Sequence, residues 1–198
     1  MIFHYLQTAQ AVKDADFDEI YPIEVKKLSG RHWTKIEIAK KAAGFLVTSP
    51  ASKVLDIGSG AGKFCFVGMA TTQGQFFGIE QRPDLVVLSR SIIQQYNLDR
   101  VHISNANVVD TNFKDFDAFY LFNPFHENLE KHSSIDKSLP LSRPIYSRYK
   151  KYVFGQLQDM PAGTRVVTYS VNGSQIPPSY KAVRKEQGGL LKYYEKQG

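Results

Sequence analysis

The sequence predicts an α/β fold, with a doubly wound, mostly parallel sheet flanked by helices and a C-terminal antiparallel hairpin. Short apolar runs of strand length alternate with segments of helical periodicity between residues 53 and 122. A glycine-rich turn at residues 58–62 directly follows the first of these runs. Near the C-terminus, Gly188 and Gly189 join two strand-like runs, as expected of a hairpin.

The chain has 198 residues, which suits one domain with a sizeable core and leaves little room for two. Its 42% hydrophobic and 13% aromatic content indicates a globular protein and excludes a disordered one. The net charge of +6 permits an acidic partner such as nucleic acid, although 19 acidic residues dilute it.

The single cysteine, Cys65, excludes an internal disulfide and supplies no metal-ligand cluster, so we expect no metal. Because it lies between two phenylalanines, we expect a buried packing residue. The N-terminus lacks the pattern of a signal peptide, and no apolar segment is long enough to cross a bilayer. These features predict a cytoplasmic protein with no membrane partner.

The N-terminal residues 1–33 are weakly patterned, and we expect an extension there, with a role as a lid left open. The domain itself is expected over residues 34–198. Thr34 stands three residues before Glu37, a capping-box spacing that predicts a helix continuing to Leu46. Trp33, just before the N-terminus of this helix, is expected to be a packing residue.

The middle of the chain predicts strands and helices in regular alternation, and this order indicates parallel strands with right-handed crossovers. The predicted elements are a strand at 53–57, a helix at 63–72, a strand at 75–80, a helix from Pro83, and strands at 100–104 and 117–122. Pro83 suits the first turn of its helix, where the missing N–H costs nothing.

A long polar connection follows at residues 126–143, and such connections are usually functional or mobile. After it we expect a helix from about Pro144 and a fifth strand at 165–171. The hairpin is predicted from the runs 180–186 and 190–195.

The most specific signal is an acid followed by three glycines at alternate positions, over residues 56–62. A dinucleotide fingerprint needs a glycine or alanine at its sixth place, where this chain has Lys63. A phosphate loop needs a hydroxyl after its Gly-Lys pair, where this chain has Phe64. Neither template fits.

The pattern Asp56-x-Gly58-x-Gly60-x-Gly62 instead resembles the cofactor-binding motif of class I S-adenosylmethionine-dependent methyltransferases. The resemblance implies a Rossmann-like methyltransferase fold and S-adenosylmethionine as cofactor. It also implies that Asp56 and the backbone of the turn, Ser59 included, hold the amino-acid end of the cofactor. That end carries an ammonium group and no pyrophosphate, which suits an acid.

The same resemblance implies residues for the nucleoside end of the cofactor. Glu80, at the end of the second strand, matches an acid whose carboxylate accepts hydrogen bonds from both ribose hydroxyls. Gln81 beside it would line the adenine pocket, with a plain surface position as the alternative. Asn105 and Ala106 fall where the family has an acid followed by alanine, and the Asn105 side-chain oxygen can still accept from the adenine amino group.

Asn123-Pro124-Phe125, after the fourth strand, resembles the Asn-Pro-Pro-Tyr/Phe motif of amino-group methyltransferases, with one proline missing. The resemblance implies that Asn123 accepts a hydrogen bond from the target nitrogen and that Phe125 packs on the substrate. The alternative is a turn that only leads the chain out of the strand. His126 is a second candidate, as a base for another kind of acceptor.

The function implied is an S-adenosylmethionine-dependent methyltransferase acting on nitrogen. A non-catalytic S-adenosylmethionine-binding module that regulates or scaffolds is the alternative. A third hypothesis, an NAD-dependent oxidoreductase on the same sheet, is opposed by Lys63. The methyl acceptor stays open among protein, small molecule and, less favoured, nucleic acid, and the oligomeric state stays open too.

Overall fold

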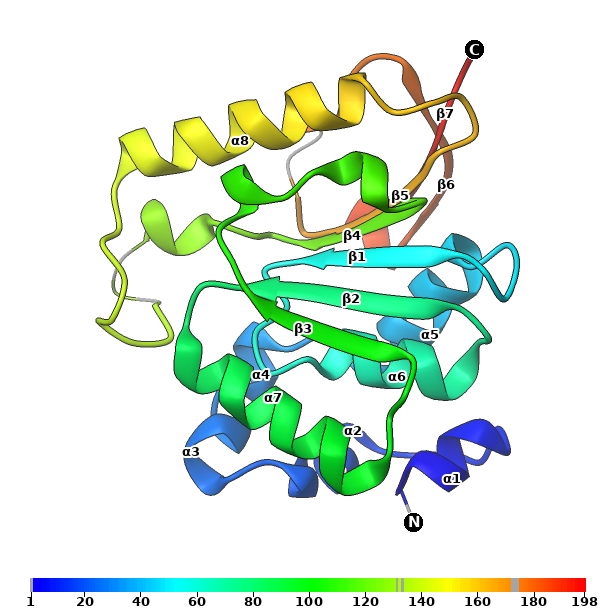
Figure 1. Ribbon diagram of the computed structural model, residues 1–198, viewed down its shortest axis with the longest axis vertical. Coiled ribbons are helices and arrows are strands. Elements are labelled where there is room, and N and C mark those ends of the chain that lie inside the picture. Colours follow the sequence, from blue (N-terminus) through cyan, green and yellow to red (C-terminus); the bar gives the residue numbers. More distant parts are fainter. Residues whose placement is uncertain (1, 131, 133, 172–174) are drawn as a thin grey trace.

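A computed structural model describes residues 2–130, 132, 134–171 and 175–198. In this part of the chain one seven-stranded sheet has the order β3-β2-β1-β4-β5-β7-β6 (Figure 1). Strands β1 to β5 pair in parallel, and β7 runs antiparallel to both β5 and β6. The strand bounds are β1 Lys53–Ile57, β2 Gln75–Glu80, β3 Val101–Asn105, β4 Ala118–Phe122, β5 Arg165–Tyr169, β6 Tyr180–Glu186 and β7 Leu191–Lys196.

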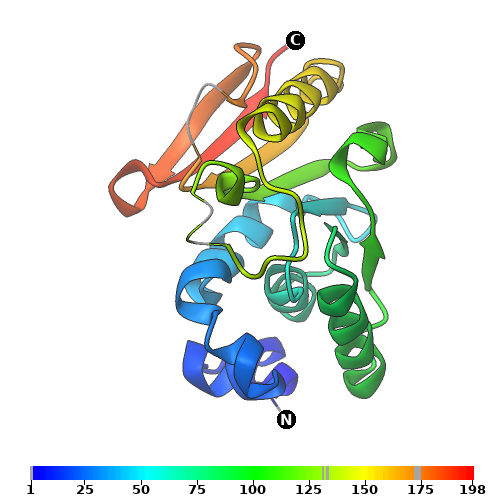
Figure 2. The same cartoon turned by 90° about the vertical axis from the view of Figure 1, so that its left-hand side faces the viewer.

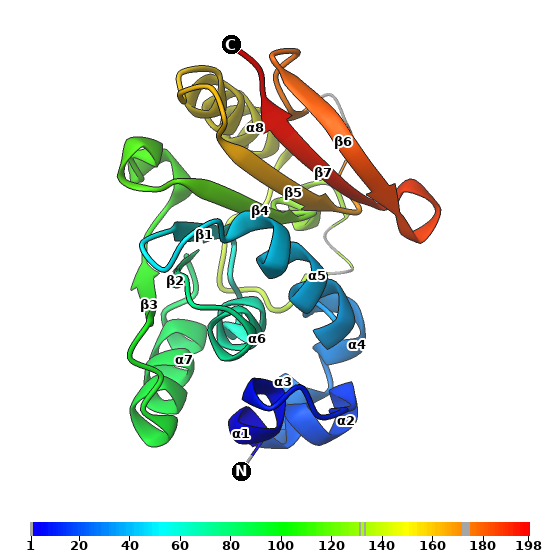
Figure 3. The same cartoon turned by 90° about the vertical axis from the view of Figure 1, so that its right-hand side faces the viewer.

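Helices cover both faces of the sheet, with α5, α6 and α7 on one face and α8 on the other (Figures 1 and 3). The α-helices are α1 Ile2–Gln7, α2 Asp14–Phe17, α3 Ile23–Lys26, α4 Ser29–His32, α5 Ile36–Leu46, α6 Lys63–Thr71, α7 Pro83–Tyr96 and α8 Arg143–Gln158. The single turns of 3-10 helix are η1 Asp18–Ile20, η2 Val108–Asp110, η3 Phe113–Asp115, η4 His126–Asn128 and η7 Gln187–Gly189. The doubly wound sheet and the C-terminal hairpin are confirmed.

Two hydrophobic clusters, one on each face of the sheet, form the core. Alternate residues of β1 supply both clusters, with Val54 in the cluster under α5 and α6 and Leu55 in the one under α8. The period of two along a strand explains this division, because neighbouring side chains point to opposite faces. Cys65 is fully buried in the first cluster, as predicted.

The N-terminal helices α1 to α4 lie beyond α5 and α6, on the side of the sheet away from α8 (Figures 2 and 3). Phe3, Leu6 and Phe17 from this part of the chain are buried in the same cluster as α5 and α6. Lys63, at the start of α6, is buried and lies 2.7 Å from a carboxylate oxygen of Asp18. A domain boundary after residue 33 stays a prediction.

The predicted capping box at Thr34 is wrong. Helix α5 begins at Ile36 after Lys35, and the Ile36 amide donates to the Asp14 carboxylate at 3.0 Å. The Thr34 hydroxyl instead pairs with the Tyr120 hydroxyl at 3.0 Å. The cap therefore comes from another segment of the chain, which local spacing cannot show.

Most other predicted bounds agree with the structure within two residues. Pro83 is at the first turn of α7, as expected. The predicted connection at 126–143 includes residues 131 and 133, which lie outside the described residues. Among the helices of the described residues, none is long and apolar enough to span a membrane.

Candidate active site

A cavity of about 500 Å³ lies at the carboxyl ends of β1, β2 and β4. After β1 the chain continues into α6 on one face, and after β4 it continues to α8 on the other face. Ligands of open α/β sheets bind at such a switch point. The volume falls within the range of small-molecule sites, roughly 300–1,000 Å³.

The structure brings most of the predicted site residues to the cavity wall. Those in the wall are Gly58, Gly60, Glu80, Gln81, Ala106, Asn123, Pro124 and Phe125. Asp56, Ser59, Gly62 and Asn105 do not contribute to the wall.

The glycine turn has a left-handed backbone at Gly58, Gly60 and Gly62, where φ is 78°, 53° and 83°. A Cβ on Gly60 would lie 2.2 Å from the Trp33 ring, so only glycine fits beneath that ring. The indole N–H of Trp33 donates to the Val25 carbonyl at 3.1 Å and fixes the ring in place. Trp33 is buried, as predicted, and it also forms part of the cavity wall.

Glu80 is a buried carboxylate at the end of β2. Its Oε2 accepts from the Gly60 amide at 3.1 Å, and its Oε1 accepts from the Arg82 amide at 2.9 Å. Burial raises the pKa of Glu80, and the backbone amides and the Arg82 charge partly oppose that rise. The carboxylate is therefore held in one orientation at the cavity wall.

Asp56 lies on β1 beneath the turn, on the α6 side of the sheet, with its Oδ2 3.8 Å from Cys65 Sγ. Burial, and next the Glu80 charge, raise the pKa of Asp56 to about 8. The raised pKa favours the protonated form of this buried carboxyl group.

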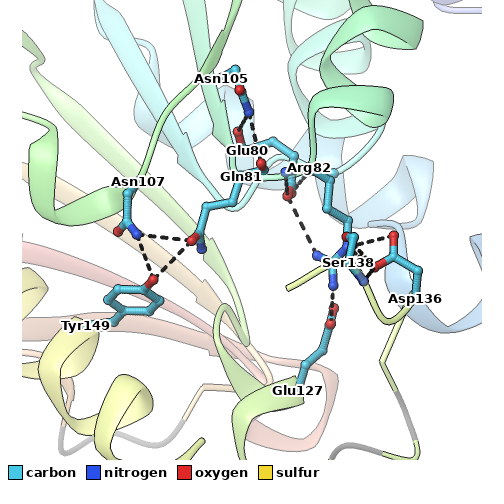
Figure 4. Close-up of polar contacts among 10 residues, drawn as sticks. Glu80, Gln81, Arg82, Asn105, Asn107, Glu127, Asp136, Ser138 and Tyr149 are labelled. Atoms are coloured by element: carbon cyan, nitrogen blue, oxygen red, sulfur yellow. Dashed lines mark hydrogen bonds and ion pairs between the residues drawn. The ribbon is translucent and has the colours of Figure 1, made fainter. Parts of the chain in front are cut away.

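Gln81, Asn107 and Tyr149 form a hydrogen-bonded group beside the cavity (Figure 4). The Tyr149 hydroxyl donates to Gln81 Oε1 at 3.0 Å, and Asn107 Nδ2 donates to the same oxygen at 3.0 Å. Because Gln81 Oε1 has two donors, the orientation of this side-chain amide is fixed. Asn105 Nδ2 donates to the backbone carbonyls of Glu80 and Gln81, both at 3.0 Å, and so fastens the end of β2.

The turn after β4 has a left-handed backbone at Asn123 and Phe125, with φ of 39° and 74°. Left-handed backbone at a bulky aromatic residue is uncommon and costs free energy, on the order of 1–3 kcal/mol. Among the described residues, no hydrogen bond engages the Asn123 side-chain amide. The Phe125 ring packs against Tyr149 with ring centroids 5.1 Å apart.

Sequence reasoning missed three residues at this site. Tyr149 falls within the helix predicted from about Pro144 but received no role there, and neither did Asn107. Arg82 is 5% exposed and pairs with Glu127 and Asp136 (Figure 4). Its position two residues after the strand-end acid is the one signal in the sequence that pointed to it.

The comparisons with known proteins agree with this fold. A family described as "Methyltransferase domain" matches residues 48–176, well over half of the chain. No curated protein sequence matches.

Several solved structures share the fold at low sequence identity. An RNA methyltransferase from Salinibacter ruber in complex with S-adenosyl-L-homocysteine is 19% identical, with a TM-score of 0.58 over 83% of this chain and 93% of that one. An O-methyltransferase from Bacillus cereus, also in complex with S-adenosylhomocysteine, is 15% identical, with a TM-score of 0.60 over 98% and 97%. TrmN from Thermus thermophilus is 15% identical, with a TM-score of 0.59 over 88% of this chain and 52% of that one. This chain thus belongs to the methyltransferase-domain family and is a class I S-adenosylmethionine-dependent methyltransferase.

Proposed function

We propose that this methyltransferase acts on a nitrogen atom of its acceptor, with Asn123 holding that atom. The observation that carries the proposal is that Asn123 lines the cavity from a left-handed turn directly after β4. Asparagine tolerates this backbone conformation better than most residues.

The residues of the cavity fit S-adenosylmethionine. Glu80 offers both carboxylate oxygens to a cis-diol, and Gly58 and Gly60 let a ligand approach the backbone closely. Gln81 and Ala106 would flank the base, and Gln81 Nε2 remains a donor because its Oε1 is engaged by Tyr149. Asp56, Ser59 and Gly62 would support this site from outside the wall.

When bound, the cofactor supplies an electrophilic methyl group next to a cationic sulfur. Asn123 Oδ1 would accept an N–H of the acceptor and so fix the direction of the nitrogen lone pair. Phe125 and Pro124 form apolar wall beside it, which excludes water and limits the orientations of the acceptor. Alignment and exclusion of water can supply a large part of the rate of an in-line displacement without a strong base.

The segment 30–33 also lines the cavity, which supports a role for the N-terminal extension in covering it. The structural neighbours include an RNA methyltransferase and an O-methyltransferase, so they do not select an acceptor for this chain.

The experiment is transfer of tritiated methyl groups from S-adenosylmethionine into a fractionated cell extract. The labelled fraction identifies the acceptor class, and Asn123→Ala should bind the cofactor with wild-type affinity yet lose at least about a hundredfold in transfer. Asn97→Ala is the matched control, because Asn97 also has a left-handed backbone, with φ of 53°, but lies at the end of α7.

Full transfer by Asn123→Ala would overturn the nitrogen-directed role. If the wild type binds the cofactor and labels nothing in protein, RNA or small-molecule fractions, the regulatory or scaffolding alternative gains support instead.

A further inference from the structure

Arg82 carries a buried charge at the turn between β2 and α7. Its side chain is 6% exposed, and its guanidinium faces three carboxylates (Figure 4). Nη2 lies 2.6 Å from Glu127, Nε lies 3.1 Å from Asp136, and Nη1 lies 3.7 Å from Glu80. One side chain thus connects the strand-end acid to two points in the chain after β4.

Those two points belong to what we call the acceptor-side segment, defined as η4 (His126–Asn128) together with residues 134–142. Its residues in the cavity wall include Glu127, Ile135, Leu139 and Pro140. Beyond η4 no regular helix or strand fixes the segment in the described residues. Its placement over the cavity therefore depends on side-chain contacts.

The contacts within the segment are local. Asp136 accepts from the Ser138 amide and hydroxyl, and Asn128 Oδ1 accepts from the Ser142 amide. The hydrogen bonds and ion pairs of Arg82 link Glu127 and Asp136 to the cofactor-side half of the cavity.

We propose that Arg82 is a positioning residue that couples the cofactor-binding carboxylate, Glu80, to the acceptor-side segment. The inference rests on the proposed function, because it takes Glu80 as the group that binds the cofactor ribose. Binding of the cofactor at Glu80 then stabilises the ordered acceptor-side segment, and the ordered segment raises the affinity for the cofactor by the same factor.

The guanidinium is suited to this task in a way that an ammonium group is not. Its nitrogens form a rigid planar fork, so Nε and Nη2 can bind two carboxylates from different directions at once. A lysine at this position would keep the positive charge near Glu80 but present a single point charge. The exchange of arginine for lysine therefore separates the effect of charge from the effect of geometry.

Positive charge beside Glu80 also favours the ionised carboxylate, which is the form that accepts hydrogen bonds from a diol on both oxygens. Removal of Asp136 would leave that charge in place and release only the segment. A loss of ligand affinity in an Asp136 variant would therefore report the coupling itself.

The test uses the full chain and S-adenosylhomocysteine as probe, with affinity measured by isothermal titration calorimetry. Arg82→Lys and Asp136→Asn should each bind about fivefold or more weakly than wild type, and the double variant no more weakly than Arg82→Lys alone. Glu195→Gln is the matched control, because Glu195 also pairs with an arginine at 3.3 Å, is similarly exposed, and lies outside the cavity wall.

Hydrogen exchange gives a second readout that a loss of general stability would not reproduce. S-adenosylhomocysteine should slow exchange of amides 134–142 in the wild type, by about fivefold or more, and leave it unchanged in Arg82→Lys. Wild-type affinity in Asp136→Asn would overturn the inference, whatever the affinity of Arg82→Lys. The inference would also be overturned if S-adenosylhomocysteine left the hydrogen exchange of residues 134–142 unchanged in the wild type.

Glu80→Ala separates this inference from the function on which it rests. If Glu80→Ala binds weakly while Asp136→Asn binds like wild type, the coupling fails and the proposed site stands. If Glu80→Ala binds S-adenosylhomocysteine like wild type, the coupling fails and so does the assignment of Glu80 to the cofactor site.

Discussion

Lys63 Nζ lies 2.7 Å from Asp18 Oδ1, and both side chains are more than nine-tenths buried. Asp14 Oδ1 is also 2.7 Å from Nζ, although the Asp14 side chain is 41% exposed. Lys63 starts the helix that follows the glycine turn, whereas both acids come from the N-terminal extension. A buried ion pair thus fastens the extension to the helix behind the cofactor turn.

Lys63→Met should destabilise the fold by about 3 kcal/mol, because it leaves Asp18 buried without a partner. Urea unfolding followed by circular dichroism measures this loss. Asp14→Asn should cost less, because that side chain is partly hydrated. A Lys63→Met protein within about 0.5 kcal/mol of wild type would show that the pair adds nothing to stability.

The packing of Trp33 on Gly60 predicts that Gly60→Ala disrupts the cofactor turn. The added Cβ meets the indole ring, and a left-handed alanine costs about 1–2 kcal/mol besides. We expect S-adenosylhomocysteine affinity to fall at least about tenfold by calorimetry.

Gly155→Ala is the control for that change, since a Cβ there meets nothing within 4 Å. Trp33→Leu in the Gly60→Ala background should recover part of the affinity, because it removes the clash but not the backbone strain. No recovery would mean that the loss does not come from the clash with Trp33.

The raised pKa of Asp56 predicts a specific pH dependence of stability. The folded-state pKa of about 8 lies above the ordinary aspartate value of 3.8, so between these pH values the folded protein binds a proton that the unfolded chain has lost. The free energy of unfolding should therefore fall as pH rises through this window, by up to about 1.4 kcal/mol per pH unit from this group. Glu80, whose pKa is also raised, acts in the same direction.

Asp56→Asn should flatten that dependence. Its free energy of unfolding should fall less between pH 5 and pH 8.5 than that of the wild type. Urea denaturation at a series of pH values from 4 to 9 gives the two curves. If the two proteins give parallel curves, Asp56 does not titrate in the window.

The contact of Tyr149 with Gln81 predicts that Tyr149→Phe weakens cofactor binding. Without the hydroxyl, Gln81 Oε1 loses one of its two donors and the amide can turn. We expect S-adenosylhomocysteine affinity to fall by about three- to tenfold.

Tyr152→Phe provides the control, because Tyr152 is on the same helix and its hydroxyl donates to the Thr111 carbonyl, away from the cavity wall. Equal losses in the two variants would assign the effect to the stability of α8 and not to Gln81.

The sequence predicted the fold and most of the cavity wall for local reasons. The periodicities of strands and helices depend on residues close together in the chain. A glycine turn after an apolar strand places Gly58 and Gly60 at the ligand-binding edge of the sheet in any such fold. Glu80 ends β2 and Asn123 directly follows β4, and these two parallel strands lie on either side of β1, so the topology brings both residues to the same edge. The side-chain orientation of Asn105 was not predictable, because it depends on backbone carbonyls of another strand.

By itself the sequence determined the order of strands and helices, the turn, and the residues that end each strand, since these depend on residues close together in the chain. Only the tertiary structure decided how Lys63 is used. In the sequence it was a departure from the dinucleotide-binding fingerprint, and in the structure it is a buried cation bound by acids from 45 and 49 residues earlier. Arg82 is the second case, since its partners Glu127 and Asp136 come 45 and 54 residues later. Burial removes water from these charges, so each needs a partner, and the position of that partner is set by the folded chain and not by local sequence.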